Sequence, residues 1–122
     1  MSSNGNNKTV VICNNADTGT FPTLIMSTSA IALGDDVITF FCPGGASALV
    51  KGELEKLQGK KGMPDPVDLY DTLVEQGGRV ILCELAIEAK GIKKEDLRQG
   101  VEILSAPAFL MESEGAHLSL TF

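Results

Sequence analysis

The sequence has few aromatic residues: no tryptophan, one tyrosine and five phenylalanines among 122 residues. It therefore shows no platform on which nucleic-acid bases could stack. The formal net charge is −6, and binding of a phosphate backbone requires a basic face that this composition does not favour. These shortages predict that the protein does not bind nucleic acid.

Long apolar runs are also missing. No stretch approaches the ~20 apolar residues that a membrane helix needs. Residues 1–7, MSSNGNN, have neither the basic nor the apolar region of a secretion signal. We therefore expect no membrane contact, a cytoplasmic location, and a short disordered tail over residues 1–7. Residues 8–122, in a chain that is 43% hydrophobic, are expected to form a single domain.

Several cofactor and metal motifs are absent as well. No C-x-x-C pair occurs, which argues against a thioredoxin-type motif and the common zinc spacings. Glycine-rich phosphate fingerprints are also lacking. The single histidine, His117, begins the last expected strand, which in a parallel sheet is the end opposite the cysteines, so a Cys–His pair is not expected. The sequence predicts neither a metal nor a cofactor.

Runs typical of strands alternate with segments typical of helices. The expected strands are residues 9–13, 36–42, 79–83, 101–104 and 117–122, the last at a sheet edge. The expected helices begin after Thr18 or Thr20, at Pro43, at Pro66 behind Asp65, at Glu84, and behind Ser105. This alternation predicts a mainly parallel sheet with helices on both faces. The first helix is apolar nearly all round, so we expect it to pack on the sheet and also on another subunit.

All three cysteines close one of the expected strands: KTVVIC ends at Cys13, DVITFFC at Cys42 and RVILC at Cys83. Ligands of open α/β sheets bind outside the carboxyl ends of the strands, so the thiols are expected on one rim. An odd number of cysteines in a reducing compartment favours free or reactive thiols over a disulfide framework. Plain packing is the alternative, since cysteine is often buried.

Cys83 has the most favourable chemical setting. A helix is expected directly after it, and the partial positive charge of a helix N-terminus favours the nucleophilic thiolate. Glu84 and Glu88 act in the opposite direction, because nearby carboxylates disfavour a second negative charge. The sequence thus points to Cys83 as the reactive thiol without deciding which effect is larger.

The residues after Cys42 suggest a different kind of site. The run CPGGAS could present the N–H groups of Gly44, Gly45 and Ala46 to an anionic group. Alternatively, the two glycines only make a tight turn between strand and helix. Cys13 is expected to be a packed residue, and a role as a second thiol stays open for Cys13 and Cys42.

Three stretches are similar to the DsrE/DsrF-like family: KTVVICNNAD, ALGDDVITFF and above all GGRVILCELAIEAKGIKKEDL. The last matches the family's order of a Gly-led strand, a cysteine, a short helix, a Gly-Ile pair and an acidic turn. This resemblance covers residues 8–122. It implies a three-layer α/β/α fold with a five-stranded, mainly parallel sheet, and assembly into oligomers such as trimers or hexamers. In members that transfer sulfur, the matching cysteine carries a persulfide or thiosulfonate, and here that residue is Cys83.

Two functions from different classes follow. In the first, the protein is a sulfur carrier or sulfurtransferase without a cofactor. It takes sulfane sulfur on Cys83 from a donor protein or small compound and passes it to an acceptor thiol. In the second, it is an oligomeric binding module for a small anion or a partner protein, and the thiols only pack. A third hypothesis, a thiol–disulfide sensor, pairs Cys83 with Cys13 or Cys42 and requires two Cα atoms within about 7 Å.

Overall fold

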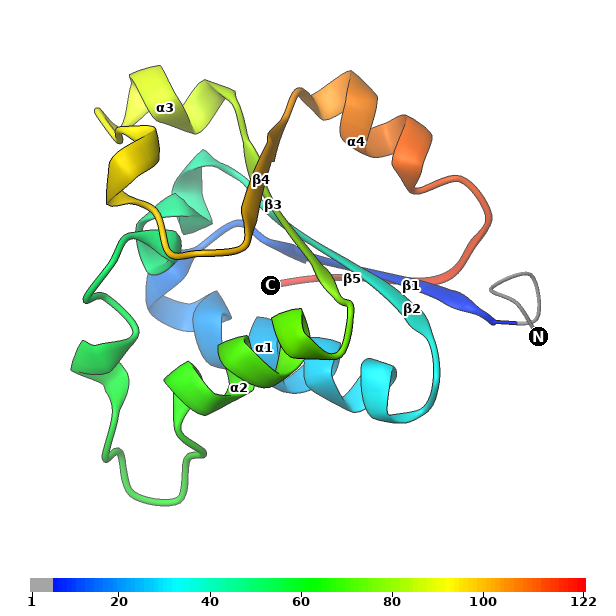
Figure 1. Ribbon diagram of the computed structural model, residues 1–122, viewed down its shortest axis with the longest axis horizontal. Helices are drawn as coiled ribbons and strands as arrows, with labels where there is room; N and C mark the ends of the chain where they lie inside the picture. The colour runs from blue at the N-terminus through cyan, green and yellow to red at the C-terminus, as the bar shows by residue number, and fades with distance from the viewer. Residues whose placement is uncertain (1–5) are drawn as a thin grey trace.

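The computed structural model describes residues 6–122, so residues 1–5 of the expected tail lie outside the described residues. Five strands form one sheet in the order β4-β3-β2-β1-β5, and all neighbouring strands run parallel (Figure 1). Their bounds are β1 Lys8–Cys13, β2 Asp36–Phe41, β3 Arg79–Cys83, β4 Val101–Leu104 and β5 Ala116–Thr121. The prediction of a mainly parallel five-stranded sheet is confirmed, and the last strand lies at an edge as expected.

Helices cover both faces of this sheet. The helices α1 (Ala16–Ala32) and α2 (Pro66–Glu75) lie on one side, and α4 (Ala106–Glu112) lies on the other (Figure 1). The short α3 (Leu85–Ala89) follows β3 at the carboxyl edge. Three 3₁₀ segments complete the connections: η2 Pro43–Leu49, η3 Glu55–Leu57 and η4 Lys94–Asp96. The three-layer α/β/α arrangement is therefore present.

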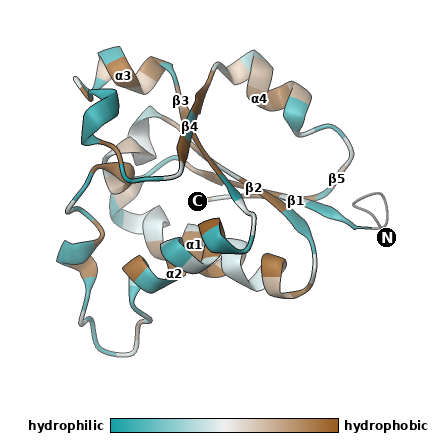
Figure 2. Ribbon diagram, in the orientation of Figure 1, coloured by the Kyte–Doolittle hydropathy of each residue, from teal (hydrophilic) through white to brown (hydrophobic). Residues whose placement is uncertain are grey.

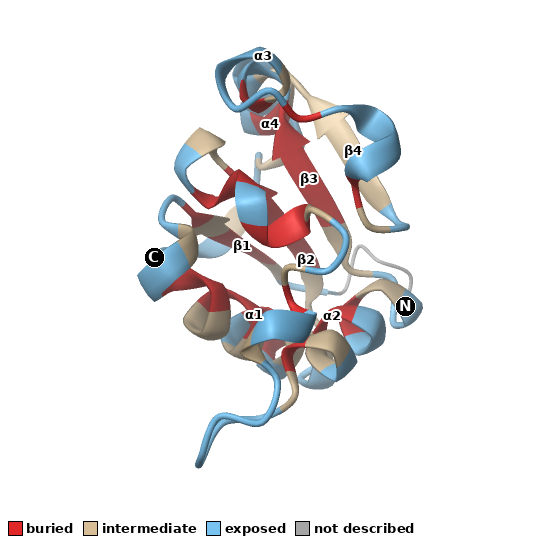
Figure 3. Cartoon of the chain, turned by 90° about the vertical axis from the view of Figure 1, so that its left-hand side faces the viewer, coloured by how far each residue is buried: buried red, intermediate tan, exposed pale blue. Residues whose placement is uncertain are grey.

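The strands in the middle of the sheet carry the core. The strands β1, β2 and β3 are mostly buried, whereas β4 is intermediate and β5 largely exposed (Figure 3). Apolar residues gather on the strands (Figure 2). Their side chains alternate between two clusters, one under α1 and α2 and one under α4. In the second cluster the rings of Phe40 and Phe109 stack with centroids 3.9 Å apart. This alternation decides which layer each strand residue faces.

Helix α1 packs on the sheet in an unexpected way. Its buried face consists mainly of small and hydroxyl residues: Gly19, Thr20, Thr23, Leu24, Ser27 and Ala30. In this layer Ser27 Oγ lies 2.9 Å from Thr39 Oγ1, whereas the buried Thr23 Oγ1 has no hydrogen-bond partner among the described residues. Two of its apolar side chains, Met26 and Leu33, are exposed instead. Small residues let the helix approach the sheet closely. The helix packs on the sheet as expected, while its packing on another subunit stays a prediction.

Two predicted helix caps are present and one is wrong. Asp65 accepts the N–H of Val67 at 2.8 Å, and Ser105 accepts the N–H of Ala108 at 3.2 Å. Helix α1, however, does not begin behind Thr18 or Thr20. Asn15 caps it by accepting the N–H groups of Asp17 and Thr18 at 2.9 and 3.1 Å. The error came from Pro22, which was read as a first-turn residue but lies inside the helix.

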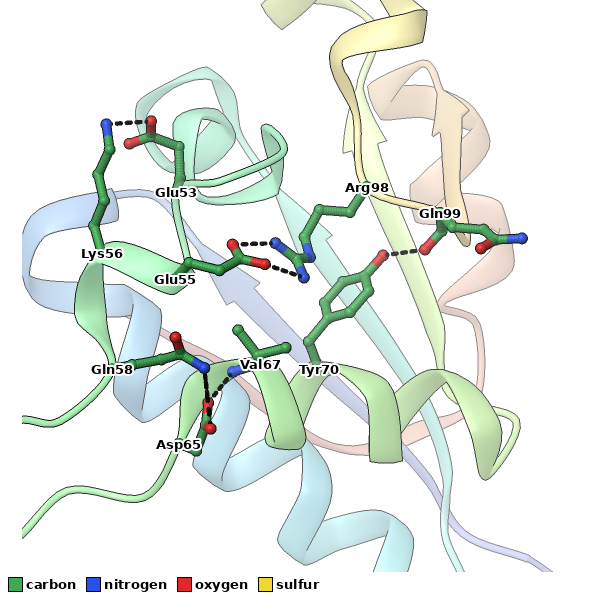
Figure 4. A network of polar contacts seen from close by, with 9 residues as sticks. All are labelled: Glu53, Glu55, Lys56, Gln58, Asp65, Val67, Tyr70, Arg98 and Gln99. Carbon is green, nitrogen blue, oxygen red and sulfur yellow. Dashed lines mark hydrogen bonds and ion pairs between the residues drawn. The ribbon is translucent and has the colours of Figure 1, made fainter.

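The chain between η2 and α2 is tied to the segment before β4 by a polar network (Figure 4). Arg98 donates two hydrogen bonds to the Glu55 carboxylate, at 2.8 and 3.1 Å, and its guanidinium lies 5.3 Å from the centre of the Tyr70 ring. The Tyr70 hydroxyl donates to the carbonyl of Gln99 at 2.8 Å. Burial raises the pKa of Tyr70 to about 12, so this donor keeps its proton at neutral pH.

The Asn15 cap can be tested against the cap that the sequence suggested. We expect Asn15→Ala to lower the free energy of unfolding by about 1 kcal/mol, because two N–H groups of α1 lose their acceptor. The control Thr18→Ala should stay within about 0.5 kcal/mol of wild type, since that side chain is exposed. Urea unfolding followed by circular dichroism measures both. A larger loss for Thr18→Ala would contradict the assignment.

Candidate functional site

The three cysteines lie at the carboxyl edge of three neighbouring strands. Cys13 ends β1 and pairs with Phe41, and Phe41 in turn pairs with Leu82 of β3. Cys42 therefore comes one residue beyond the level of Cys13, and all three thiols are free. The shared rim that the sequence predicted is present.

The pleat of the sheet nevertheless divides the thiols between two faces. Cys13 belongs to the cluster under α1 and α2. Cys83 belongs to the cluster under α4, and Cys42 packs against that same cluster. Successive side chains of a strand point to opposite faces, so the strand register decides this division. Cys42 and Cys83 therefore form a pair on one face, and Cys13 lies on the other.

Cys13 is enclosed on its face of the sheet. Its thiol is fully buried and donates to the carbonyl of Asn15 at 3.6 Å. A Cβ added at Gly19 or Gly45 would lie only 3.3 or 2.9 Å from its sulfur, so both glycines pack closely over it. Burial raises the pKa of the Cys13 thiol, which favours the neutral form. These contacts fit the packed residue that the sequence predicted.

Cys42 and Cys83 are close neighbours that differ in exposure. When the pairing of Phe41 with Leu82 is continued by one residue, Cys42 lies opposite Cys83. Neighbouring strands lie about 4.8 Å apart, which is inside the Cα limit that the sensor hypothesis requires. Cys83 is only 3% exposed, whereas Cys42 is partly exposed. Burial, and then the nearness of the Cys83 and Cys13 thiols, raise the pKa of Cys42.

The start of α3 provides fewer free N–H groups near Cys83 than the sequence suggested. The helix has only five residues, and Glu84 at its N-cap makes no side-chain capping bond. The N–H of Glu84, the first after Cys83, donates to the carbonyl of Leu104 in β4 at 2.9 Å. This N–H is thus part of the sheet and does not serve the thiol. Both Glu84 and Glu88 are exposed, so water screens their charges.

The glycines after Cys42 are explained by close packing. A Cβ on Gly44 would lie 2.2 Å from the carbonyl oxygen of Asn14, and one on Gly45 would lie 2.5 Å from that of Cys13. The segment is a 3₁₀ helix, and the Gly45 N–H already donates to the Cys42 carbonyl at 2.9 Å. Ala46 is fully buried. Anion binding by Gly44, Gly45 and Ala46 stays a prediction, and the tight turn that was the alternative is present.

Two surface hollows flank the residue after Cys42. One is lined by Pro43, Gly44, Ser47, Val50, Glu53, Lys90 and Ile92. The other, of about 610 Å³, is lined by Pro43, Glu84, Leu85, Glu88 and Ala89. Both share Pro43, the residue after Cys42, and the second also includes Glu84, the residue after Cys83. Neither Cys42 nor Cys83 lines these hollows, so a molecule bound at this rim would lie next to the thiol pair.

His117 lies at the other edge of the sheet. It is the second residue of β5, beside the first residues of β1, and its Nε2 lies 3.2 Å from Thr9 Oγ1 and 3.3 Å from Asp35 Oδ2. The hydrogen bond from Thr9 contributes most to lowering the pKa of Asp35. His117 is exposed at the sheet edge, as predicted, although these two contacts were not foreseen. The only histidine of the chain therefore cannot serve the thiols as a base.

Within residues 6–122, no three or more His, Cys, Asp and Glu side chains are grouped so that they could hold a metal ion. In the same part of the chain, no helix combines the length and apolar character needed to cross a bilayer.

The fold and the rim define a small parallel α/β protein with cysteines at the carboxyl ends of adjacent strands. Residues 7–120 match the DsrE/DsrF-like family, and the chain belongs to this family. It is also 31% identical over 90 residues to the uncharacterized protein MJ0760 of Methanocaldococcus jannaschii. That alignment covers 74% of this chain but 32% of the relative, so the chain matches about a third of the longer protein.

Two solved structures share the fold. The ychN protein from E. coli superposes with a TM-score of 0.76 at 20% identity, over 96% of this chain and 99% of the other. The protein of unknown function MTH1491 from Methanobacterium thermoautotrophicum gives a TM-score of 0.69 at 16% identity, over 94% and 99% of the two chains. At these identities the likeness establishes the fold alone, and it confirms the fold that the sequence predicted.

Close packing at Gly45 leads to a testable expectation. Gly45→Ala should lower the free energy of unfolding by about 1–3 kcal/mol, because the new methyl group would overlap the Cys13 carbonyl and thiol. Ser47→Ala is the matched control, since Ser47 lies in the same 3₁₀ helix but is exposed. Chemical denaturation of the two variants measures the difference. If Gly45→Ala is as stable as the control, the glycine is not required for packing.

Proposed function

We propose that the protein is a sulfur carrier that holds sulfane sulfur as a persulfide on Cys83 and relays it to an acceptor thiol. Membership of the DsrE/DsrF-like family, which is related to sulfur relay, supports this proposal. The observation that carries it is the position of Cys83, which ends β3 at the carboxyl edge and is followed directly by the short α3. This is the place at which the family's sulfur-transferring members carry their cysteine.

The proposed chemistry needs only thiol exchange. The Cys83 thiolate attacks the sulfane sulfur of a donor, a bond forms between Cys83 Sγ and that sulfur, and the donor leaves as a thiolate. An acceptor thiolate then attacks the outer sulfur of the persulfide and restores Cys83. In this sense the protein would be a sulfurtransferase without a cofactor. Its apolar neighbours in the α4-side cluster, which include Phe40, Ile81 and Phe109, would keep water away from the bound sulfur.

The proposal includes the surroundings in which such a carrier works. Free thiols persist in a reducing compartment, so we place the protein in the cytoplasm. Its partners would be proteins or small sulfane-sulfur compounds that donate sulfur, and proteins that accept it. The exposed acidic residues Glu84 and Glu88 beside the rim would face these partners.

A binding module is the second candidate, and the burial of Cys83 favours it. A thiol that is 3% exposed reacts slowly unless the structure around it opens. In this alternative the two hollows beside Pro43 hold a small anion or a partner segment, and the cysteines only pack.

We also propose that the chain forms a homo-oligomer, such as a trimer or hexamer. Leu110 and Met111 of α4 are 65% and 72% exposed, and they are adjacent residues on the side of the sheet that α4 covers. Beside them, a surface groove runs between α4 and the exposed edge strand β5. Water contact with adjacent large apolar side chains is unfavourable, and a second subunit would remove it.

The carrier proposal predicts a specific mass change. After incubation with polysulfide, wild type should gain one or more sulfur atoms, and Cys83→Ser should not gain them at that position. Cys13→Ser is the matched control and should load like wild type, because Cys13 lies on the other face of the sheet. Mass spectrometry of the cysteine peptides after digestion, with and without prior reduction, assigns the gain to each cysteine. If wild type gains no sulfur while its thiols are shown to be reduced, the binding module becomes the better explanation.

The oligomer proposal predicts that α4 variants dissociate. Wild type should elute with a mass that is a multiple of the chain mass, and the double variant Leu110→Glu, Met111→Glu should elute as a monomer. Leu33→Glu is the control, because Leu33 is 83% exposed but caps α1, on the opposite face of the sheet. Dissociation of that variant alone would place the subunit contact on the first helix, as the sequence suggested, and not on α4. Size-exclusion chromatography with light scattering measures all three. A monomeric wild type would rule the oligomer out.

A further inference from the structure

The proposed carrier thiol, Cys83, is buried, whereas its neighbour Cys42 is the thiol that faces solvent. Cys83 is almost fully covered, and neither thiol of the pair lines a hollow at the rim. Cys42 is partly exposed, directly precedes the Pro43 shared by both hollows, and packs against the cluster that contains Cys83. A bulky donor therefore meets Cys42 before it can reach Cys83.

We propose, on the basis of the carrier function above, that Cys42 is the port thiol through which sulfane sulfur enters and leaves Cys83. The register carries this inference: Phe41 pairs with Leu82, so the next residues, Cys42 and Cys83, come level on neighbouring strands. Both face the α4 side of the sheet, where no strand lies between them. A sulfur atom on one thiol is thus within reach of the other.

The spacing of the pair suits the passage of a sulfur atom and would also permit a direct disulfide. Level residues of neighbouring strands are about 4.8 Å apart, and the Cα atoms of a disulfide usually lie about 4.4–6.8 Å apart.

The transfer step is balanced within the pair. The Cys42 persulfide presents its outer sulfur to Cys83, and the Cys83 thiolate attacks that atom. The bond between the outer sulfur and Cys83 forms while its bond to Cys42 breaks, and the leaving Cys42 thiolate takes up the proton that Cys83 gave up. Cys42–S–SH and Cys83–SH become Cys42–SH and Cys83–S–SH, so no external oxidant or reductant is used. Delivery to an acceptor is the reverse sequence.

Cys13 does not share this role although it lies on the same rim. Its side chain points to the α1 and α2 face, where Gly19 and Gly45 close over the sulfur. It is therefore a matched control with the same chemistry at the same edge of the sheet.

The test follows sulfur on each cysteine with time. Wild type, Cys42→Ser, Cys83→Ser and Cys13→Ser are incubated with polysulfide, quenched with iodoacetamide at intervals, digested, and analysed by mass spectrometry for persulfide on each cysteine peptide. We expect sulfur on Cys42 first and on Cys83 afterwards. Cys42→Ser should slow the loading of Cys83 by about tenfold or more, since reaction then depends on exposure of a covered thiol. Cys13→Ser should leave the order and rates unchanged.

The possible results separate this proposal from the carrier function. If Cys83 in Cys42→Ser loads at the wild-type rate, the port is overturned and the carrier stands. If wild type takes up no sulfur on Cys83, the carrier fails, and the port fails with it. Thermal unfolding checks that the variants are folded, and Cys42→Ala replaces Cys42→Ser if the latter is not. The order in which the two cysteines are labelled can be measured in wild type alone. Sulfur appearing on Cys83 before Cys42 would also overturn the proposal that Cys42 is the port thiol.

Discussion

The register between β2 and β3 is the constraint on which the site depends. Because Phe41 pairs with Leu82, the residues that follow come level, and the pleat turns both thiols toward α4. A shift by one residue would place Cys42 in the other layer and would exchange the side chains of the strand between the two packed clusters. The buried clusters on both faces prevent such a shift. The packing of the core therefore also determines which thiols are paired.

The two helical layers differ in how closely they cover the sheet. The α1 face is closely packed through small and hydroxyl residues, and it encloses Cys13. The α4 face is covered by a helix of only seven residues, and its edge strands remain partly open. The proposed sulfur transfer and the proposed subunit contact both lie on this α4 face. A second subunit there would lie near the thiol pair, so assembly and access to sulfur would affect each other.

Much of this fold could be read from the sequence, and the parts that could not share a cause. The bounds of β3 and β4 were predicted to the residue, since apolar runs and flanking glycines mark them clearly. The start of α1 was misplaced because Pro22 suggested a later beginning than Asn15 provides. The rim of cysteines followed from strand ends alone. Which face each thiol takes depends on register between strands, and a single sequence does not record it.

The segments that follow Cys42 and Cys83 are fastened to each other away from the thiols. The Arg98 N–H donates to the carbonyl of Leu49 at 2.9 Å, and the Lys51 N–H donates to that of Asp96 at 2.8 Å. The Arg98 side chain adds its contacts with Glu55 and the Tyr70 ring. These bonds join the end of η2 to the chain that leaves α3. The two segments that border the rim are thus joined by backbone hydrogen bonds. Direct exposure of Cys83 would therefore require a local movement of α3 while these bonds hold, and not a separation of the two segments.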